Sequence, residues 1–509
     1  MVVGAGSGRE TKEIELKLEF APTDATKIKS HPLLAAWTRG VPRVQELVSI
    51  YFDTPDLALS KRGVFLRVRE SGGRYVQTIK AMQSAADLFE RFEWETEVSG
   101  RAPDLDAAQG TALGPLLTPA LRAALRLLFE TRMRRTLHRL TDSGSEIEVA
   151  IDQGEIVAGA RATAISEVEL ELKEGDTAAL FRLARTLAET VPLRLAVKTK
   201  AERGFELLAD ADFAVEKAGD LDIKPEVTTA DAFRAIARNC LRQIIVNEPA
   251  MCAGRAEALH QMRVGLRRLR AAITIFADVL AGSDEERIKA ELRWITRELG
   301  PARDLDVFAA DVLRPLQAAH PADQRVSAAH RDFEERRKTA YARAAGSVGS
   351  NRFRNALLDL AEWIEVGAWA SNETAVAGSI TEYAANELAR LSKQIKKRGA
   401  DLRHRSTHQR HRLRIRAKRL RYATEFFAST FPAEANIKRR AEMLSALRDL
   451  QDALGGLNDL ETRHGLMRED ASNSAIPDPT KEQALRDRLL KAAEQAFVRF
   501  AAAKPFWKA

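Results

Sequence analysis

Charged side chains alternate with apolar ones along several short stretches of the first 210 residues. In EIELKLEF (13–20), Glu13, Glu15 and Lys17 fall at every second position. Successive side chains of a strand point to opposite faces, so these three share one face and the apolar residues between them share the other. Two acids and a base on one face are typical either of a solvated sheet edge or of the wall of a site.

Five further stretches repeat this arrangement. Their same-face charges are Arg67 and Arg69; Arg91, Glu93, Glu95 and Glu97; Glu148 and Asp152; Glu167, Glu169 and Glu171; and Lys198 and Lys200. Any one such strand is typical of a solvent face. Clustered like charges on neighbouring strands are destabilising unless something neutralises them, so six strands together favour an interior lined by charge.

Acids on some strands and bases on others suit one class of ligand. Carboxylates bind Mg²⁺ or Mn²⁺ through hard oxygen atoms, whereas arginine and lysine bind phosphate oxygens. A metal and basic groups around a polyphosphate are what phosphoryl transfer requires. The pattern therefore indicates a phosphate site.

The elements that must position these residues are short strands with a few helices. Gly-containing breaks at 71–73 and 142–144 predict hairpins. Helices are expected at 119–130 and 176–190. The expected strands are 12–20, 47–53, 63–70, 74–81, 91–98, 132–140, 145–152, 165–173 and 196–202. That many strands favour a closed or nearly closed antiparallel barrel, with the polar residues inside and the apolar ones under the helices.

The pattern changes after a linker rich in charge, Gly and Pro (216–231), beyond which apolar residues recur at helical spacing. We expect an α+β chain with a strand-rich domain at 1–212, a linker at 213–230 and an all-α domain at 231–509. A chain of 509 residues is long enough for at least two cores.

The helical half contains an internal repeat. HQMRVGLRRLRA (260–271) matches HRLRIRAKRLRY (411–422), and each is followed by a second matching block, at 292–306 and 447–461. The order is kept and the spacing nearly so, which predicts a duplication into two helical bundles.

Each repeat carries a row of cations, which we call the cationic ridge. At about 100° per residue its four members fall within roughly 80° of arc. The ridges are His260, Arg263, Arg267 and Arg270 in the first repeat and His411, Arg414, Lys418 and Arg421 in the second, with Arg268 and Arg419 flanking them. Such a face is usually only solvated surface. Acids are almost absent here, so an anion-binding surface is the better interpretation.

The overall charge agrees with an anionic partner. The net charge is +8, and 396–421 alone holds twelve Lys and Arg against one acid, Asp401. A metal site at His404, His408 and His411 is disfavoured because the surrounding cations would repel a divalent ion. Nucleic acid ranks below polyphosphate because Tyr422 is the one aromatic residue close enough in these basic stretches to stack a base.

Other features limit the location of the protein. Two cysteines, Cys240 and Cys252, cannot build a disulfide framework, which favours a reduced cytoplasmic protein. No apolar run approaches the length of a membrane span, and the N-terminus lacks the pattern of a signal peptide. The glycine-rich GAGSG (4–8) lacks the Lys-Ser/Thr of a phosphate loop and is expected to be a flexible tail.

The strand half resembles the CYTH, or triphosphate tunnel metalloenzyme, family. EIELK matches its ExExK signature, and YFDTPDLAL (51–59), LRVR (66–69), TIK (78–80), EVAID, SEVELEL and KTKAERGF (198–205) extend the match over about 10–210. The resemblance implies an eight-stranded antiparallel tunnel that binds triphosphate-containing substrates with Mg²⁺ or Mn²⁺.

The resemblance also implies roles for individual residues. The implied metal-binding acids are Glu13, Glu15, Asp152, Glu167 and Glu169. The implied phosphate contacts are Lys17, Arg67, Arg69, Lys80, Arg135 and Lys200, with Lys198 sharing the role of Lys200 on the same strand face, and with Arg91, Glu93 and Glu171 in supporting roles. The register at Arg135 is uncertain because Arg132 and Arg134 lie beside it.

The helical half resembles the CHAD family over about 225–505, through both His/Arg helices and the blocks LGPARDLDV and LGGLNDLE. This resemblance implies two helical bundles that bind inorganic polyphosphate through the two cationic ridges, with polyphosphate granules as a candidate location.

Together the resemblances predict a metal-dependent inorganic triphosphatase that releases pyrophosphate and phosphate. The alternatives are a thiamine triphosphatase, an adenylate cyclase of the same fold, or a non-catalytic polyphosphate-binding protein. The acidic residues argue against the last, because a pure anion receptor has no need of them.

Overall fold

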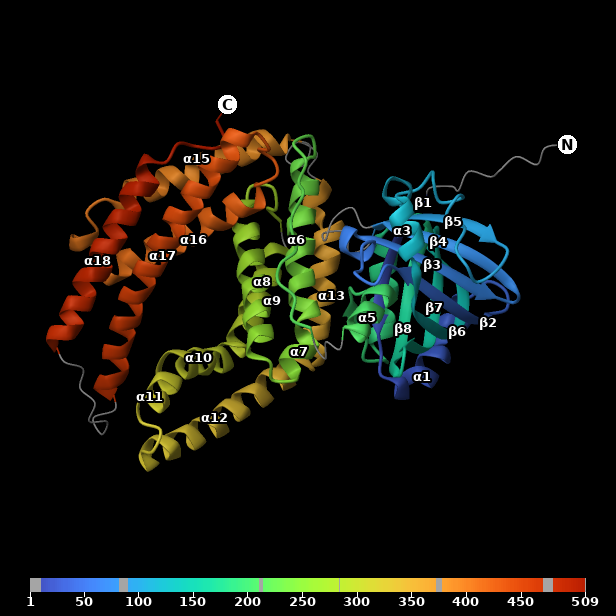
Figure 1. The fold of residues 1–509 in the computed structure, drawn as a ribbon, viewed down its shortest axis with the longest axis horizontal. Coiled ribbons are helices and arrows are strands. Elements are labelled where there is room, and N and C mark those ends of the chain that lie inside the picture. Colours follow the sequence, from blue (N-terminus) through green and yellow to red (C-terminus); the bar gives the residue numbers. More distant parts are fainter. Residues whose placement is uncertain are drawn as a thin grey trace. The chain divides into compact units, whose positions relative to one another are not determined.

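The computed structural model describes residues 11–81, 90–209, 214–282, 284–371, 378–469 and 479–508 (Figure 1). For 11–13, 90–92, 459, 461–469, 479 and 481 it describes the backbone alone. The glycine-rich stretch 4–8 lies outside the described residues, and so do the side chains of Glu13 and Arg91.

Residues 11–81 and 90–209 form an antiparallel sheet with flanking helices. Its strands are β1 (Thr11–Glu19), β2 (Arg43–Asp53), β3 (Val64–Ser71), β4 (Arg74–Ala81), β5 (Glu90–Val98), β6 (Arg126–Asp142), β7 (Ser145–Ala158), β8 (Arg161–Glu174) and β9 (Arg194–Ala196). The helices are α1 (Ala25–Lys29), α2 (Pro32–Trp37), α3 (Pro119–Ala124), α4 (Ala178–Ala188) and α5 (Lys200–Leu208).

The strand order is β5-β4-β3-β2-β6-β7-β8-β1-β9, and β1 also pairs with β5. An antiparallel sheet followed by an all-helical half confirms the expected α+β class, and among the described residues the sheet has nine strands, as many as the pattern predicts and one more than the resemblance implies. The ninth, β9, is a three-residue strand beside β1. Closure into a barrel stays a prediction.

Both predicted hairpins are present, because their turns hold residues in the left-handed region. Gly72 and Gly73 join β3 to β4, and Ser143 and Gly144 join β6 to β7, all with positive φ. Such two-residue turns match the twist of the paired strands. They fix the register that places alternate charges on one face.

Two expected elements were wrong in part. The helix expected at 119–130 ends at Ala124, because the following residues pair with β2 as part of β6, where Phe129 stacks on Tyr51 with ring centroids 4.6 Å apart. The strand expected at 196–202 ends at Ala196. Helix α5 then begins at Lys200, because Thr199 and Glu202 form a capping box.

The apolar faces of the strands form the core, as expected. Leu16 and Leu18 are 1% and 2% exposed, and α4, whose buried face includes Phe181 and Leu187, packs on β1 and β8. The polar face of β1 is also enclosed, since Glu15 and Lys17 are buried. Both faces of β1, the charged one and the apolar one, are therefore buried.

The second half is helical. Its helices are α6 (Thr229–Val246), α7 (Glu248–Cys252), α8 (Ala256–Ile275), α9 (Asp284–Glu298), α10 (Gly300–Phe308), α11 (Arg314–Ala319), α12 (Gln324–Val348), α13 (Asn351–Val366), α15 (Ile380–Gly399), α16 (Thr407–Phe426), α17 (Glu434–Glu469) and α18 (Pro479–Ala502). Among the described helices, none is both long and apolar enough to cross a membrane.

The chain folds into two compact units. One comprises 1–220, 238–266 and 283–368, and the other 221–237, 267–282 and 369–509. The sequence boundaries expected for the domains stay a prediction.

Candidate functional site

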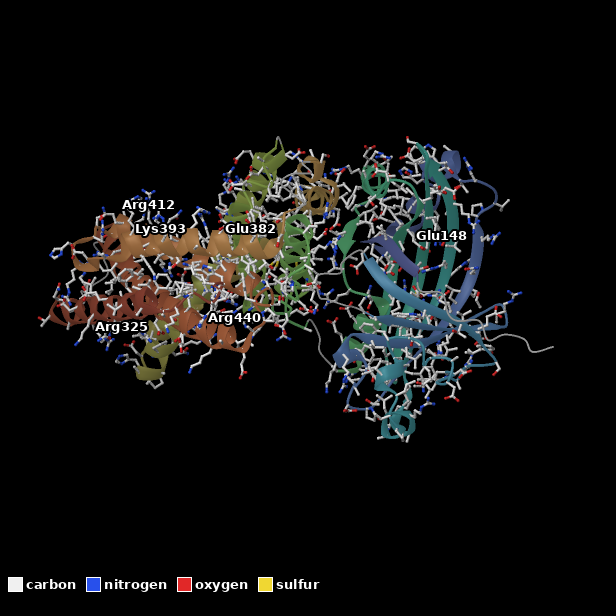
Figure 2. All side chains as sticks on the ribbon, turned by 90° about the horizontal axis from the view of Figure 1, so that it is seen from above. Glu148, Arg325, Glu382, Lys393, Arg412 and Arg440 are labelled. Carbon is white, nitrogen blue, oxygen red and sulfur yellow. The ribbon has the colours of Figure 1, made fainter. Side chains whose placement is uncertain are left out.

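Charged side chains from neighbouring strands surround one cavity of about 240 Å³, which we call the polar pocket. Its lining residues are Glu15, Lys17, Tyr51, Phe65, Arg67, Arg69, Lys80, Ala81, Glu93, Glu95, Arg135, Glu148, Glu169, Glu171, Lys173, Thr199, Lys200 and Ala201. Figure 2 shows Glu148 among the strands of the sheet. The alternating charges of β1, β3, β5 and β8 thus meet at one cavity.

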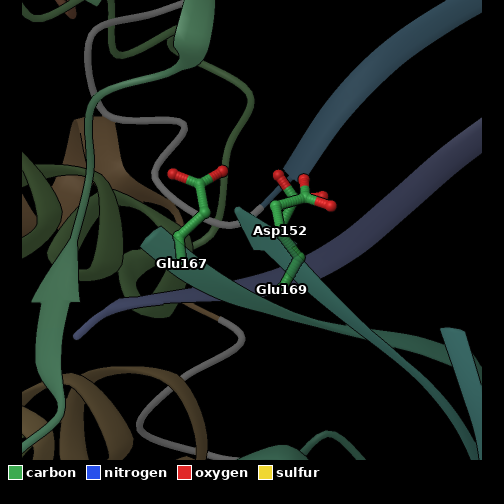
Figure 3. A group of neighbouring side chains, drawn as sticks. All are labelled: Asp152, Glu167 and Glu169. Atoms are coloured by element: carbon green, nitrogen blue, oxygen red, sulfur yellow. The ribbon is translucent and has the colours of Figure 1, made fainter. Parts of the chain in front are cut away.

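Three carboxylates of β7 and β8 lie together at this site (Figure 3). Asp152, Glu167 and Glu169, the acid triple, each offer an oxygen within 4.8 Å of the others. Asp152 and Glu167 are buried at 0% and 1% exposure. Close, buried carboxylate oxygens form the hard donor set that Mg²⁺ or Mn²⁺ prefers, so the residues fit a divalent metal.

Two cations of the chain neutralise the acid triple. Lys200 Nζ lies 2.8 Å from Asp152 Oδ2 and 3.0 Å from Glu169 Oε1, and it also contacts Glu167. Arg135 donates to both oxygens of Asp152 at 2.7 and 2.6 Å and to Glu169 Oε2 at 2.6 Å. This resolves the choice among the neighbouring arginines, since Arg132 pairs with Glu130 and Glu155, and Arg134 with Glu46.

Burial and these contacts together shift the pKa values of the three acids in different directions. Burial acts to raise the pKa of Glu169, but Lys200, Lys17 and Arg135 outweigh it and hold that pKa well below its ordinary value. The pKa of Asp152 is lowered in the same way, because Lys200 and Arg135 overcome burial. Burial dominates at Glu167, whose pKa is raised although Lys200 opposes the shift. Lys200 itself has a raised pKa because the three acids overcome its burial.

The part of the polar pocket that β3, β4 and β5 line is more cationic. Glu93 binds Arg67 at 3.3 Å and Lys80 at 2.6 Å. Arg69 donates to Ser49 Oγ at 3.4 Å. Burial, together with the neighbouring Arg67 and Arg135, lowers the pKa of Arg69 to about 10. Cations that repel one another in a pocket favour an anion between them.

The remaining sequence-predicted residues fall into three groups. Glu15 and Lys17 line the pocket and are 2.8 Å apart, and Lys17 also reaches Glu169 at 3.2 Å. Asp152 and Glu167 lie outside its lining, behind Lys200 and Arg135. Glu13 belongs to β1, and its side chain is outside the described part.

The role expected for Lys198 rested on a strand face shared with Lys200, and this part of the expectation was wrong. Lys198 and Lys200 do not share a strand face, because the chain leaves β9 at Ala196 and Lys200 opens α5. Lys198 instead pairs with Glu206 and, at 3.0 Å, with Glu216, and it does not line the polar pocket.

Tyr51 and Lys173 line the polar pocket but were not assigned to it from the sequence. Tyr51 sits in an apolar run of β2, yet it is two residues from Ser49 and therefore shares the face that meets Arg69. The spacing of two residues from Ser49 was the signal in the sequence that could have assigned Tyr51 to the pocket. Lys173 follows the SEVELEL stretch on β8 and pairs with Glu171, whose pKa burial raises.

In the helical half, the cationic ridges lie on α8 and α16. Arg267 and Arg270 are exposed, whereas His260 and Arg263 are partly buried. On α16, His411 Nδ1 lies 3.2 Å from Asn458 Oδ1, and Arg421 binds Gln451 at 3.2 Å and Glu425 at 2.7 Å. Arg268, a flanking residue, is buried over the Phe426 ring.

The two repeats make the same contact at equivalent positions. Arg263 donates to the main-chain oxygen of Thr296 at 2.9 Å, and Arg414 donates to that of Gln451 at 3.4 Å. Each acceptor comes four residues before a glycine, Gly300 or Gly455. The arginine shared by the repeats therefore ties its helix to the second matching block, which is a structural role besides any ligand contact.

Helix α16 carries cations on a second face as well. Arg412 and Arg416 lie away from the ridge, and Figure 2 shows Arg412 near Lys393 of α15. Burial lowers the pKa of Arg416, and Arg398, Arg412 and Arg419 lower it further. Because both faces of α16 carry cations, positive charge alone does not distinguish the ridge from the other face of this helix.

Comparisons with known proteins agree with the two halves. A CYTH domain model matches residues 11–205, and a CHAD domain model matches 235–468. The chain is similar to an inorganic triphosphatase of Haemophilus influenzae, with 31% identity over 206 residues. That match spans 40% of this chain and 57% of the relative, a little over half of the relative's length.

Two further similarities cover the helical half or nearly the whole chain. An uncharacterized protein of Mycobacterium tuberculosis is 24% identical over 490 residues, spanning 92% of this chain and 91% of that protein. The crystal structure of the CHAD domain from the plant Ricinus communis is 29% identical, with a TM-score of 0.46, over 56% of this chain and 96% of that one. The chain therefore consists of a CYTH domain at residues 11–205 joined to a CHAD domain at residues 235–468.

Proposed function

We propose that the polar pocket hydrolyses inorganic triphosphate to pyrophosphate and phosphate with Mg²⁺ or Mn²⁺, and that the helical half binds inorganic polyphosphate. One observation carries the first part: Glu169 of the acid triple lines the same cavity as a group of arginines and lysines, with Asp152 and Glu167 close behind it. The similarity of the CYTH domain to an inorganic triphosphatase supports it.

The arrangement suggests how the groups divide the work. Arg67, Arg69 and Lys80 bind the phosphate oxygens and neutralise their charge, which is the main requirement of phosphoryl transfer. Lys17 and Lys200 lie between the acids and the cavity and bind the phosphate nearest the acid triple. Glu15, Lys17 and Glu93 of this polar face are buried, and a site shielded from water in this way strengthens each of these contacts.

The acid triple would hold the metal, with Glu15 beside it. When bound, the metal polarises the phosphoryl oxygens and helps to orient water. A water oxygen bonds to the terminal phosphorus, the bridging P–O bond breaks, and pyrophosphate leaves with those bonding electrons. One proton of the water stays on the released phosphate, and the other passes to the pyrophosphate oxygen or to solvent. The proposed tunnel, a ring of eight strands closed through the β1–β5 pair, supplies the geometry for this in-line attack.

Polyphosphate binding by the helical half rests on the two cationic ridges and on the CHAD match. The pairing of Arg263 and Arg414 with main-chain oxygens leaves Arg267 and Arg270 as the exposed members of the first ridge. We assign these exposed members the main part in ligand contact.

Phosphate release from tripolyphosphate, ATP, thiamine triphosphate and long-chain polyphosphate, each with and without Mg²⁺ or Mn²⁺, tests the proposal. We expect metal-dependent release that is fastest with tripolyphosphate. Faster release from thiamine triphosphate, or cyclic AMP from ATP, would replace the proposed substrate with one of those alternatives.

A matched pair of variants separates catalysis from binding. Glu169→Gln should abolish release, because it removes an acid of the triple and an acceptor of Lys200 and Arg135. Glu97→Gln, an exposed acid of the same kind on β5, should leave release unchanged. Undiminished release by Glu169→Gln would refute the mechanism, and no release by the wild type with any substrate would favour a non-catalytic polyphosphate-binding protein.

A further inference from the structure

The first turn of α5 determines where Lys200 lies. Thr199 Oγ1 accepts from the Glu202 N–H at 3.0 Å, and the Thr199 N–H donates to Glu202 Oε2 at 2.8 Å. Lys200 is the first residue of the helix that this capping box starts. Its ammonium group lies 2.8 Å from Asp152 and 3.0 Å from Glu169, so a shift of this turn moves a charge at the acid triple.

An arginine from the helical half completes this turn. Arg242 of α6 donates through Nη2 to Glu202 Oε1 at 2.5 Å, and through Nη1 to the main-chain oxygen of Val197 at 3.1 Å. It thus binds the chain on both sides of Thr199. The side chains of Arg242 and Glu202 are only 13% and 19% exposed, so these charge-assisted bonds are shielded from water.

The two oxygens of Glu202 have different tasks. Oε2 closes the capping box, and Oε1 receives Arg242. With both oxygens bound, the carboxylate cannot rotate away from the helix start without breaking a contact. The same guanidinium also lies 3.5 Å from Glu216, which follows the sheet domain in the sequence.

We propose that Arg242 is a positioning residue that holds the first turn of α5, and with it Lys200, in place at the acid triple. The helical half then contributes to the hydrolytic site as well as binding its own anion. Residues around a metal site that orient its immediate contacts typically change activity by about 10- to 100-fold when lost.

The chain offers a matched control for a contact of the same kind. Arg185 of α4 also joins the strand half to the helical half, through Asp359 and, at 3.0 Å to Nε, Glu362 of α13. It does not line the polar pocket. Arg185→Ala therefore removes one arginine between the halves without disturbing Lys200.

The first measurement is kcat and KM for tripolyphosphate in wild type, Arg242→Ala, Glu202→Gln and Arg185→Ala, all in the full chain. This arm rests on the proposed function. We expect kcat/KM to fall about 10-fold or more in Arg242→Ala, mainly through kcat, and to stay near wild type in Arg185→Ala. Glu202→Gln keeps an oxygen for the Thr199 N–H but loses the ion pair, so it should resemble Arg242→Ala.

The second measurement does not depend on any activity. Acetylation of Lys200 by acetic anhydride, followed by mass spectrometry, reports how firmly the acids hold its ammonium group. Labelling should be about 10-fold faster in Arg242→Ala and Glu202→Gln than in wild type and Arg185→Ala. A double variant of Arg242 and Glu202 should add nothing to Arg242→Ala, because that single change already removes the Arg242–Glu202 ion pair together with the contacts of Arg242 with Val197 and Glu216.

The outcomes separate the two proposals. If the wild type does not hydrolyse tripolyphosphate, the proposed function is refuted. The labelling rates of Lys200 then decide alone whether Arg242 is a positioning residue. Labelling of Lys200 in Arg242→Ala and Glu202→Gln at the wild-type rate overturns the inference, as does an equal loss of kcat in Arg185→Ala. If Arg242→Ala does not fold, Glu202→Gln decides by the same criteria.

Discussion

At the scale of single residues, the position of Lys200 decides how the acid triple can act. Its ammonium group lies among Asp152, Glu167 and Glu169, where a metal bound by all three would also lie. Lys200 therefore does two opposing things: it keeps three buried acids compatible with the fold, and it competes with a divalent cation for them.

Replacing this lysine should separate the two effects. In Lys200→Met the side chain keeps its length but loses its charge, so the acid triple should bind Mn²⁺ several times more tightly. Phosphate release should nonetheless fall, since a proposed phosphate contact is gone. Titration calorimetry with Mn²⁺ and the phosphate assay check the two parts, and unchanged Mn²⁺ affinity would show that Lys200 does not compete.

The acid triple also predicts how stability depends on pH. Glu169 has a pKa below its unfolded value, because Lys200, Lys17 and Arg135 outweigh burial. Its contribution to stability is present above the unfolded value, about pH 4, and is lost as pH falls through the lower folded value. The unfolded state then binds the extra proton, so stability rises with pH in this window.

Glu169→Gln should therefore lose part of the pH dependence of the melting temperature below about pH 5. Thermal melts of wild type and variant between pH 2 and 7, roughly the range in which carboxyls titrate, measure this difference. Glu97→Gln, exposed on β5, should keep the wild-type slope. Equal slopes for all three proteins would contradict the lowered pKa of Glu169.

At the scale of elements, alternation of charge was enough to predict most strands and the face that each turns to the pocket. It failed where a local signal competed with it. Residues 196–202 alternate like a strand, but the capping box of Thr199 and Glu202 starts a helix there. Phe129 lies in a stretch of helical spacing, yet stacking on Tyr51 and pairing with β2 hold it in a strand.

The residues of the candidate site could be predicted from the sequence, but how deeply its acids are buried could not. The alternation turned Asp152 on one strand and Glu167 and Glu169 on another to the charged interior, the resemblance grouped them as metal-binding acids, and the structure brings them together. Burial of Asp152 and Glu167 behind Lys200 depends on how α5 packs, which no spacing within a strand can indicate. The contact of Arg242 with Glu202 joins residues 40 positions apart, so no periodic pattern in the sequence indicates it.

The duplicated helices allow a prediction from two equivalent glycines. A methyl group on Gly455 would lie 3.0 Å from Nη2 of Arg414, so the guanidinium must move away from Gln451. On Gly300 it would lie 3.7 Å from Nη1 of Arg263, an ordinary contact. Alanine in the middle of a helix is favoured over glycine by about 0.5–1 kcal/mol, which applies to Gly455 inside α17. Gly300 is the first residue of α10 and precedes Pro301, where a Cβ disfavours the helical conformation, so alanine brings no such gain there.

Gly455→Ala should therefore fall short of the mid-helix gain or lose stability, because Arg414 must shift from its contact with Gln451, and Gly300→Ala should not stabilise the protein. Urea unfolding of the two variants beside wild type measures both changes. The full mid-helix gain of about 0.5–1 kcal/mol in Gly455→Ala would show that Arg414 can leave its contact without loss, which would contradict its structural role.

At the scale of the whole molecule, charge is unevenly spread. In the polar pocket cations lie beside acids, whereas the stretch from Lys396 to Arg421 has twelve cations and one acid. A long polyanion bound to such a surface stabilises the folded state by mass action, by about 2.7 kcal/mol when its concentration is 100 times Kd. We therefore expect long-chain polyphosphate to raise the melting temperature of the wild type.

The ridge can be tested without disturbing the fold, because Arg267 and Arg270 are exposed. Reversing both to glutamate should remove most of the protection by polyphosphate, whereas Arg263 and Arg414 are poor choices since they bind main-chain oxygens. The matched control is the double reversal of Arg331 and Arg336 of α12, two exposed arginines outside both ridges and outside 396–421, which changes the net charge equally. If the control loses as much protection as the ridge variant, polyphosphate is held by overall charge and the assignment of the ridge is wrong.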